Sequence, residues 1–172
     1  MSFRNALPLA LVGVVSASAL AQTCDPNIRE TTPDAQFVIN PSKGTVLDKI
    51  TGLIWKRCAE GLSGTDCATG TPVFSIWGDA LGLAADSRYA GYADWRLPNA
   101  KELESLVEEK CYEPAINSKV FPGTPVQEFW TSSPFQYDAN GASYWVVGFV
   151  YGNTGNRYRN ESRAVRLVRG GH

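Results

Sequence analysis

Hydrophobic positions in the first part of the chain follow strand-like spacing. Residues 37–40 form a short apolar run, and residues 44–48 and 53–56 flank a polar turn that contains Gly52. Short runs bounded by turn residues are typical of strands, and two of them around a tight turn are typical of a β-hairpin. We therefore predict one strand over 37–40 and a hairpin over 44–56.

The spacing becomes helical after residue 75. Apolar residues then recur at three- and four-residue intervals, and Ser75 precedes them as a candidate N-cap. The pattern predicts a helix that ends near residues 85–88 and buries one stripe of side chains, namely Ile76, Trp77, Ala80, Leu81 and Ala84.

A second helix is predicted from a capping pattern. Asn99 and Glu102 have the spacing of a capping box, in which each side chain accepts a hydrogen bond from the other residue's backbone N–H. We expect this helix to stop before Pro114. Its expected core side is Leu103, Leu106 and Val107, and its expected solvent side is Glu104, Glu108 and Lys110.

The last part of the chain is rich in strand-forming residues. Residues 128–132 and 144–151 are predicted strands, residues 152–156 are a predicted turn, and residues 157–159 and 164–169 complete the pattern. Strands before and after two helices indicate an α+β fold, with two helices packed on a mainly antiparallel sheet.

The N-terminal segment resembles an export signal. Arg4 precedes an apolar run of about ten residues, and Ala19-Leu20-Ala21 has the form of a signal-peptidase site. We predict a signal peptide over residues 1–21, an N-terminal arm over 22–36 and one domain over 37–170. The expected mature protein is located in the periplasm or outside the cell and does not insert into the membrane.

Four cysteines lie in the predicted mature chain, and an even count in an oxidising compartment predicts two disulfides. The segment between Cys58 and Cys67 is polar and glycine-rich, so it closes easily. We therefore pair these two and assign the second disulfide to Cys24 and Cys111, which would tie the arm to the end of the second helix. Neither Cys-x-x-Cys nor the ligand spacing of a zinc site occurs.

Composition and charge exclude several function classes. The chain of 172 residues is 44% hydrophobic and 19% charged, as a folded globular protein is, and its net charge of −1 argues against a nucleic-acid partner. The single histidine is His172, which leaves no base for a Ser-His or Cys-His site. The densest carboxylates, at residues 104–109, lie on a predicted solvent face. We expect no catalytic site, no cofactor and no metal.

Charge divides unevenly along the chain. Residues 140–172 hold five arginines and one acid, a net charge of +4, whereas residues 22–139 hold ten basic and sixteen acidic residues, a net charge of −6. Arginine binds sulfate and carboxylate through two parallel hydrogen bonds, so this segment is a candidate anion-binding surface. Its proposed ligand-binding residues are Tyr151, Asn153, Asn156, Arg157, Tyr158 and Arg159. The alternative is a charged strand edge that resists aggregation.

Four ordered motifs carry a family resemblance. Residues 51–58 contain T-G-L-x-W, residues 94–103 contain D-W-R-L-P-x-x-x-E-L, and residues 129–133 and 164–169 match two later signatures. Together they resemble the Legionella collagen-like protein C-terminal domain family, a domain of unknown function. The motif residues that we expect to be structural are Trp55, Asp94, Trp95, Arg96, Glu102 and Trp130.

The resemblance implies a C-type-lectin-like fold, distantly similar to formylglycine-generating enzymes. The family's best-known member is an exported adhesin that binds sulfated glycosaminoglycans and assembles through a collagen-like stalk, but this chain has no Gly-x-y repeat. We expect all five tryptophans to fill the core, and Asp94 and Arg96 to have paired structural roles. Glu113-Pro114 is followed by alanine and Trp-Asn-Asp is absent, so calcium-mediated sugar binding is not supported.

These observations predict an exported, non-catalytic binding module whose partner is a glycan or a surface protein. One alternative is an interaction subunit of a cell-surface assembly. The other is an enzyme on the formylglycine-generating fold, which would need free thiols. The sequence leaves the oligomeric state open.

Overall fold

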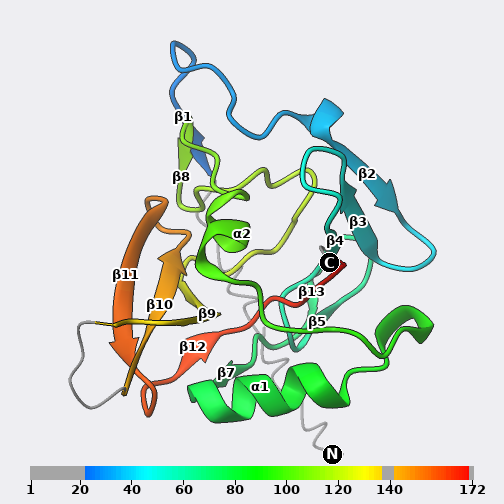
Figure 1. The fold of residues 1–172 in the computed structure, drawn as a ribbon. Coiled ribbons are helices and arrows are strands. Elements are labelled where there is room, and N and C mark those ends of the chain that lie inside the picture. The colour runs from blue at the N-terminus through cyan, green and yellow to red at the C-terminus, as the bar shows by residue number, and fades with distance from the viewer. Residues whose placement is uncertain (1–21, 137–141, 171–172) are drawn as a thin grey trace, which may run out of the picture.

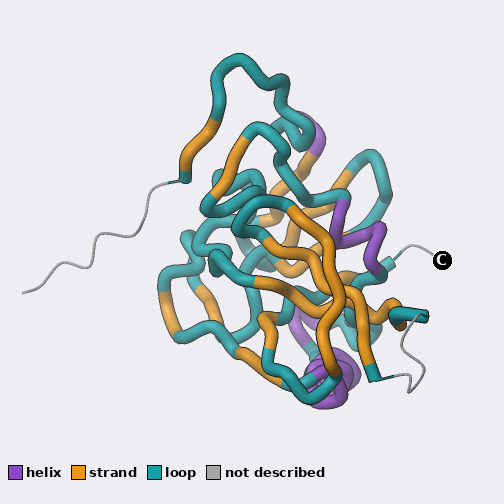
Figure 2. The backbone as a smooth tube through the Cα atoms, turned by 90° about the vertical axis from the view of Figure 1, so that its left-hand side faces the viewer, coloured by secondary structure: helices purple, strands orange, loops and turns teal. Residues whose placement is uncertain are grey.

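Two β-sheets form the centre of the molecule. The computed structural model describes residues 22–136 and 142–170; the predicted signal segment and His172 lie outside the described residues. Figure 1 shows both sheets, with helix α1 along the lower edge of the view and the short helix α2 between the two sheets. Seen from the side in Figure 2, strands cross the middle of the molecule and long loops surround them.

The larger sheet has the strand order β11-β10-β9-β12-β7 and is antiparallel except for the β12–β9 pair. Its strands are β7 (Phe74–Ser75), β9 (Glu128–Pro134), β10 (Ser143–Gly148), β11 (Asn153–Tyr158) and β12 (Arg163–Ala164).

The second sheet has the order β13-β4-β3-β2 and is fully antiparallel. Its strands are β2 (Phe37–Asn40), β3 (Thr45–Asp48), β4 (Ile54–Lys56) and β13 (Val168–Arg169). The predicted first strand and the predicted hairpin are confirmed.

Two short strand pairs and four helical segments make up the rest of the secondary structure of the described residues. The pairs are β1 (Thr23–Cys24) with β8 (Cys111–Tyr112), and β5 (Leu62–Ser63) with β6 (Thr69–Gly70). The helices are α1 (Trp77–Asp86) and α2 (Ala100–Glu104), with 3₁₀ turns η1 (Asp34–Gln36) and η2 (Tyr89–Gly91). The α+β class with mostly antiparallel sheets and two disulfides is confirmed.

The predicted start of the first helix is wrong. Ser75 lies in β7, where its backbone pairs with Arg163, and the N-cap of α1 is Ile76, which makes no side-chain capping bond. Ile76 is exposed rather than part of the buried stripe, which consists chiefly of Ala80 and Ala84. Recruitment of Ser75 into the sheet removes it from the helix end.

The second helix is shorter than predicted. Its capping box forms, with Asn99 Oδ1 accepting from Glu102 N at 2.9 Å and the Glu102 carboxylate accepting from Asn99 N at 2.7 Å. The helix ends at Glu104, however, and Cys111 lies in β8 rather than at a helix end. The expected solvent position of Glu108 is also wrong, because its side chain is buried.

Two predictions about the C-terminal strands are wrong. Residues 153–156, predicted as a turn, belong to β11, and the chain reverses just before them, where Gly152 N donates to Gly148 O at 2.9 Å. Residues 164–169 are not one strand. They begin in the larger sheet as β12 and finish in the second sheet as β13, which links the two sheets.

Aromatic side chains fill most of the core. Trp55, Trp95 and Trp130 are buried, as the motifs predicted, together with phenylalanines such as Phe121 and Phe129. The prediction that all five tryptophans lie in the core is wrong for the other two. Trp77 and Trp145 are half-buried, and Trp77 stacks on Tyr144 with ring centroids 3.6 Å apart.

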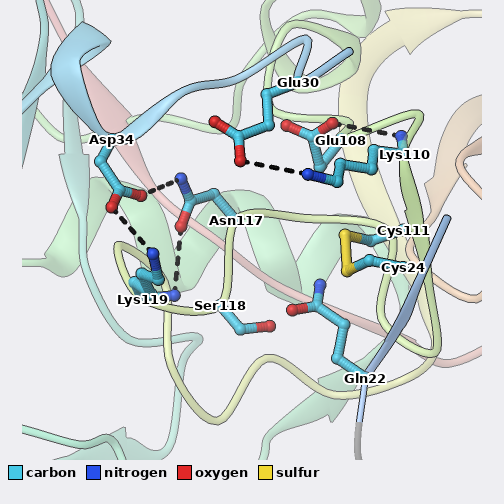
Figure 3. A pocket seen from close by; sticks show the side chains of 10 residues that line it. All are labelled: Gln22, Cys24, Glu30, Asp34, Glu108, Lys110, Cys111, Asn117, Ser118 and Lys119. Atoms are coloured by element: carbon cyan, nitrogen blue, oxygen red, sulfur yellow. Dashed lines mark hydrogen bonds and ion pairs between the residues drawn. A yellow bond between two sulfur atoms is a disulfide. The ribbon is translucent and has the colours of Figure 1, made fainter. Parts of the chain in front are cut away.

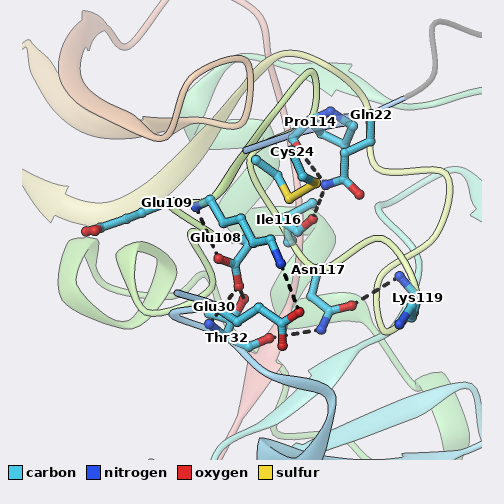
Figure 4. The surroundings of a disulfide bond; sticks show 12 residues. Gln22, Cys24, Glu30, Thr32, Glu108, Glu109, Pro114, Ile116, Asn117 and Lys119 are labelled. Atoms are coloured by element: carbon cyan, nitrogen blue, oxygen red, sulfur yellow. Dashed lines mark hydrogen bonds and ion pairs between the residues drawn. A yellow bond between two sulfur atoms is a disulfide. The ribbon is translucent and has the colours of Figure 1, made fainter. Parts of the chain in front are cut away.

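Both predicted disulfides are present: Cys24–Cys111 and Cys58–Cys67. The first joins the N-terminal arm to β8, where β1 and β8 pair as a short ladder (Figure 4).

None of the helices in the described part of the chain has the length and apolar character needed to cross a bilayer.

Candidate functional site

The arm crosses the loop after α2 and encloses a small charged cavity of about 140 Å³, which we term the arm cavity (Figure 3). Its charged side chains satisfy one another. Lys110 Nζ lies 3.3 Å from Glu30 Oε1, and Lys119 Nζ lies 3.2 Å from Asp34 Oδ2. Asn117 Nδ2 also donates to Asp34 at 2.8 Å, which lowers the pKa of that carboxyl. Because these groups already have partners, the arm cavity holds the arm in place rather than offering free binding groups.

A second cavity, of about 570 Å³, has the opposite character. It lies where the turn between β2 and β3, the disulfide loop and the η2 turn meet. No acidic residue lines it. We term it the cationic cavity; its lining residues are Pro41, Ser42, Lys43, Gly44, Arg57, Gly64, Thr65, Tyr89 and Ala90.

Lys43 lines the cationic cavity, and its side chain is exposed. Its Nζ donates to Tyr92 Oη at 2.8 Å and lies 4.7 Å from the centroid of the same ring. The ammonium lowers the pKa of Tyr92, chiefly through this hydrogen bond. The partner is a neutral phenol, so the positive charge of Lys43 is not compensated by an acid. Lys56 differs, since its ammonium pairs with Glu60 at 2.8 Å.

Arg57 contributes the second cation, held by backbone carbonyls. Its Nε donates to Val120 O at 3.0 Å and its Nη2 to Lys119 O at 3.2 Å, and its Nη1 contacts Thr65 O. Three of the five guanidinium N–H donors are therefore used, and two remain for a ligand. Carbonyl partners fix the orientation of the guanidinium without neutralising its charge.

Tyr89 closes the third side of the cationic cavity. Its hydroxyl donates to Gly44 O at 3.2 Å. Gly44 has a φ of +61°, and a Cβ at this position would lie 2.0 Å from Tyr89 Oη, so only glycine permits this contact. The β2–β3 turn is thus held against the η2 turn, which shapes this side of the cavity. Burial, followed by the nearby Glu60 carboxylate, raises the pKa of Tyr89.

The six residues proposed from the charge pattern are spread along β11 and the segments at its two ends. Tyr151 and Asn153 lie at one end of β11, whereas Tyr158 and Arg159 lie at the other, about 17 Å away for a strand of this length. Asn156 lies between them, opposite Trp145.

The arginines of this segment are mostly compensated. Arg157 and Arg163 both pair with Glu128, and Arg169 pairs with Asp94 at 2.8 Å. Arg157 is only partly exposed, with 37% of its side chain accessible, and the Glu128 carboxylate holds its guanidinium. Only Arg159 is exposed with no ion pair among the described residues. The binding role of the six residues stays a prediction.

Arg166 is one of the five arginines of the candidate anion-binding segment, but it does not lie on the surface. It is fully buried. Its Nη1 donates to Lys56 O at 3.0 Å and its Nη2 to Thr124 Oγ1 at 2.8 Å. Burial lowers the pKa of this guanidinium to about 9. Arg166 therefore belongs to the core and offers nothing to a surface ligand.

The charged motif residues have paired roles, as expected, although not with each other. Arg96 forms a bidentate pair with Glu102, at 2.7 and 2.8 Å, and Asp94 pairs with Arg169. The Glu102 carboxylate thus serves both Arg96 and the capping box. These contacts anchor the start of α2 to Gly170, which follows β13 and whose carbonyl accepts from Arg96 Nη2 at 2.9 Å.

The cationic cavity was not predicted from the sequence. Its three key residues come from segments with no shared motif, and only the fold brings together Lys43, Arg57 and Tyr89.

No cluster of three or more His, Cys, Asp or Glu side chains suited to a metal ion occurs within residues 22–136 and 142–170.

The fold and the cavities define a disulfide-bonded α+β module with a surface cavity lined by two cationic residues. The chain belongs to the Lcl C-terminal domain family, whose match covers residues 44–169. This confirms the family resemblance carried by the four motifs. No curated protein matches the chain.

Proposed function

We propose that this chain is an exported, non-catalytic binding module that takes an acidic glycan in the cationic cavity. The observation that carries the proposal is the charge of the lining: two cations with neutral partners and no acidic residue. A local basic site attracts an anion even when the protein's total charge is negative. A C-type-lectin-like fold, implied by the family, is part of the same proposal.

The remaining lining suits a sulfated or carboxylated sugar. Free donors on Lys43 and Arg57 match the acceptor oxygens of sulfate or carboxylate. Ser42 and Thr65 add hydroxyl-bearing side chains next to the cations. A cavity of about 570 Å³ is within the size range of small-molecule sites.

Cysteine chemistry supports a non-catalytic role and export. All four cysteines are in disulfides, which leaves no thiolate for an enzyme of the formylglycine-generating type. Two disulfides are compatible with an oxidising compartment. A surface protein presenting acidic groups is the second candidate partner, because the same lining would attract it.

The test is the affinity for a heparin-derived hexasaccharide, measured by calorimetry at about 0.05–0.15 M salt, where exposed charges still act over 8 Å or more. Lys43→Ser should weaken binding about threefold to tenfold, since it removes one exposed charged donor. Lys49→Ser is the matched control: Lys49 is also exposed and forms no ion pair among the described residues.

A third variant separates the two candidate surfaces. Arg159→Ser removes the uncompensated arginine of the C-terminal segment without breaking the Arg157–Glu128 pair. If Arg159→Ser weakens binding and Lys43→Ser does not, the ligand binds at the C-terminal strands. If the parent protein binds no hexasaccharide, the acidic-glycan proposal fails.

A further inference from the structure

Two exposed tyrosines and an isoleucine line a third cavity, which is an open groove. Tyr112 in β8 is 44% exposed, and Tyr151, in the turn between β10 and β11, is 69% exposed. Their ring centroids lie 6.3 Å apart with an angle of 36° between the planes. Ile28 of the arm is exposed in the same groove, whose volume is about 470 Å³. We term this the tyrosine groove. Large apolar groups gathered at one exposed position indicate a binding surface.

The backbone holds the two rings in place. Glu113 N donates to Val150 O at 2.8 Å, which joins the residue after Tyr112 to the residue before Tyr151. Gly152 has a φ of +77°, and a Cβ there would lie 2.6 Å from Val107 Cγ1, so the turn packs closely on the loop after α2. The Cys24–Cys111 disulfide lies next to Tyr112 in β8 and ties this strand to the arm. A groove held in this way loses little conformational freedom on binding.

The tyrosine groove is lined by more negative than positive side chains. Asp25 and Glu109 line it, and no hydrogen bond or ion pair engages the Glu109 carboxylate within the described residues. Asp25 Oδ1 accepts from Asn27 N at 2.8 Å. The Lys110 ammonium, the cation of this lining, is paired with Glu30 at 3.3 Å. The groove therefore has a net negative character, opposite to that of the cationic cavity.

We propose that the tyrosine groove binds a neutral pyranose unit of a glycan. The C–H face of a pyranose ring removes apolar surface from water when it packs on an aromatic ring. Its hydroxyl groups donate hydrogen bonds, which the Asp25 and Glu109 carboxylates accept. A sulfated or carboxylated sugar would bring a negative charge toward these two carboxylates, which disfavours it. The expected ligand is neutral rather than acidic, and the tyrosine groove is separate from the cationic cavity. This site therefore goes beyond the proposed function.

The experiment uses four neutral hexasaccharides, built from β-linked glucose, α-linked glucose, β-linked mannose and β-linked N-acetylglucosamine. We expect at least one to bind the full chain, with an affinity that does not change between about 0.05 and 0.5 M salt because no ion pair forms. Tyr112→Ala and Tyr151→Ala should each weaken binding at least about fivefold, whereas Phe at either position should preserve it.

Matched variants make the result decisive. Phe74→Ala is the control, because Phe74 is an exposed aromatic residue in β7, at 46%, and does not line the groove. Lys43→Ser should leave neutral-sugar binding unchanged, which separates this site from the cationic cavity. If Tyr112→Ala does not fold, Tyr151→Ala alone decides, since its side chain lies in an exposed turn.

Three outcomes would overturn the proposal. The first is that none of the four hexasaccharides binds at millimolar concentration. The second is binding that survives Tyr151→Ala. The third is that a hexalysine peptide binds and loses affinity with Tyr151→Ala while the sugars do not bind, which would make the groove a site for cationic peptides.

Discussion

Glu108 is a buried carboxylate whose charge is stabilised by hydrogen bonds. It is 3% exposed, and its carboxylate accepts from Thr31 N at 3.0 Å, Thr32 N at 2.8 Å and Lys110 N at 3.1 Å. Burial alone would raise the pKa of this carboxyl, but the hydrogen bonds favour the charged form and hold the pKa below its ordinary value. A carboxyl of this kind stabilises the folded state at neutral pH. That stabilisation is lost as the pH falls through the lowered folded-state pKa.

Glu108→Gln should therefore destabilise the protein in a pH-dependent way. The free energy of unfolding at pH 7 should fall by about 2 kcal/mol, because charge-assisted hydrogen bonds to the arm are weakened. The difference from the parent should shrink as the pH falls through the lowered pKa of Glu108, where the parent's carboxyl also becomes protonated. Urea unfolding at several pH values measures both effects.

The neighbouring acid provides the control for this prediction. Glu109 is exposed, so Glu109→Gln should change the free energy of unfolding by less than about 0.5 kcal/mol. Equal effects of the two variants, or a Glu108→Gln effect that persists unchanged at low pH, would contradict the role assigned to Glu108.

At the scale of elements, α2 is too short to be stable alone. It has five residues, and isolated helices of that length do not form in water. Its start is stabilised by the capping box and by the Arg96–Glu102 pair, and it packs on β9 and β10. The cap therefore determines where the chain enters the core.

Asn99→Ala tests this dependence. The variant removes the hydrogen bond from Glu102 N to the Asn99 side chain, so the free energy of unfolding should fall by about 1 kcal/mol. Lys101→Ala, in the same helix at an exposed position, should change it by less than about 0.5 kcal/mol. Chemical denaturation of both variants checks the difference; indistinguishable midpoints would show that the cap is dispensable.

Local patterns predicted elements whose stabilising contacts are near in sequence. The 44–56 hairpin and the Asn99 capping box have both partners within a few residues, and both are confirmed. Residues 153–156 were predicted as a turn from their Gly and Asn content, yet pairing with β10 makes them a strand. Residues 164–169 divide between two sheets, a choice that distant partners determine.

At the scale of the whole molecule, both candidate sites are assembled from distant segments. Tyr112 and Tyr151 are joined by the Glu113–Val150 hydrogen bond, and Lys43, Arg57 and Tyr89 meet only in the folded protein. The sequence therefore predicted the family, the class of fold and both disulfides. It offered the arginine-rich segment as a candidate anion site, because a count of charges does not show which arginines pair with acids.

The two disulfides should differ in their contribution to stability. Cys24–Cys111 joins residues 87 apart in the sequence, and Cys58–Cys67 joins residues 9 apart. By the loop-entropy argument, replacing the first pair with alanine should lower the free energy of unfolding by about 4–5 kcal/mol, and replacing the second by about 2–3 kcal/mol. Urea unfolding of the two double variants measures the ranking, and a reversed order would contradict it.

The most direct test of the central claim is to locate an acidic glycan on the folded protein. Backbone amide shifts of the isotopically labelled chain would be recorded during titration with a heparin-derived hexasaccharide. The account predicts the largest changes around the cationic cavity, at the amides of Lys43, Gly44, Thr65 and Ala90. Shift changes confined to β11 and the residues after it, or no changes at all, would contradict it.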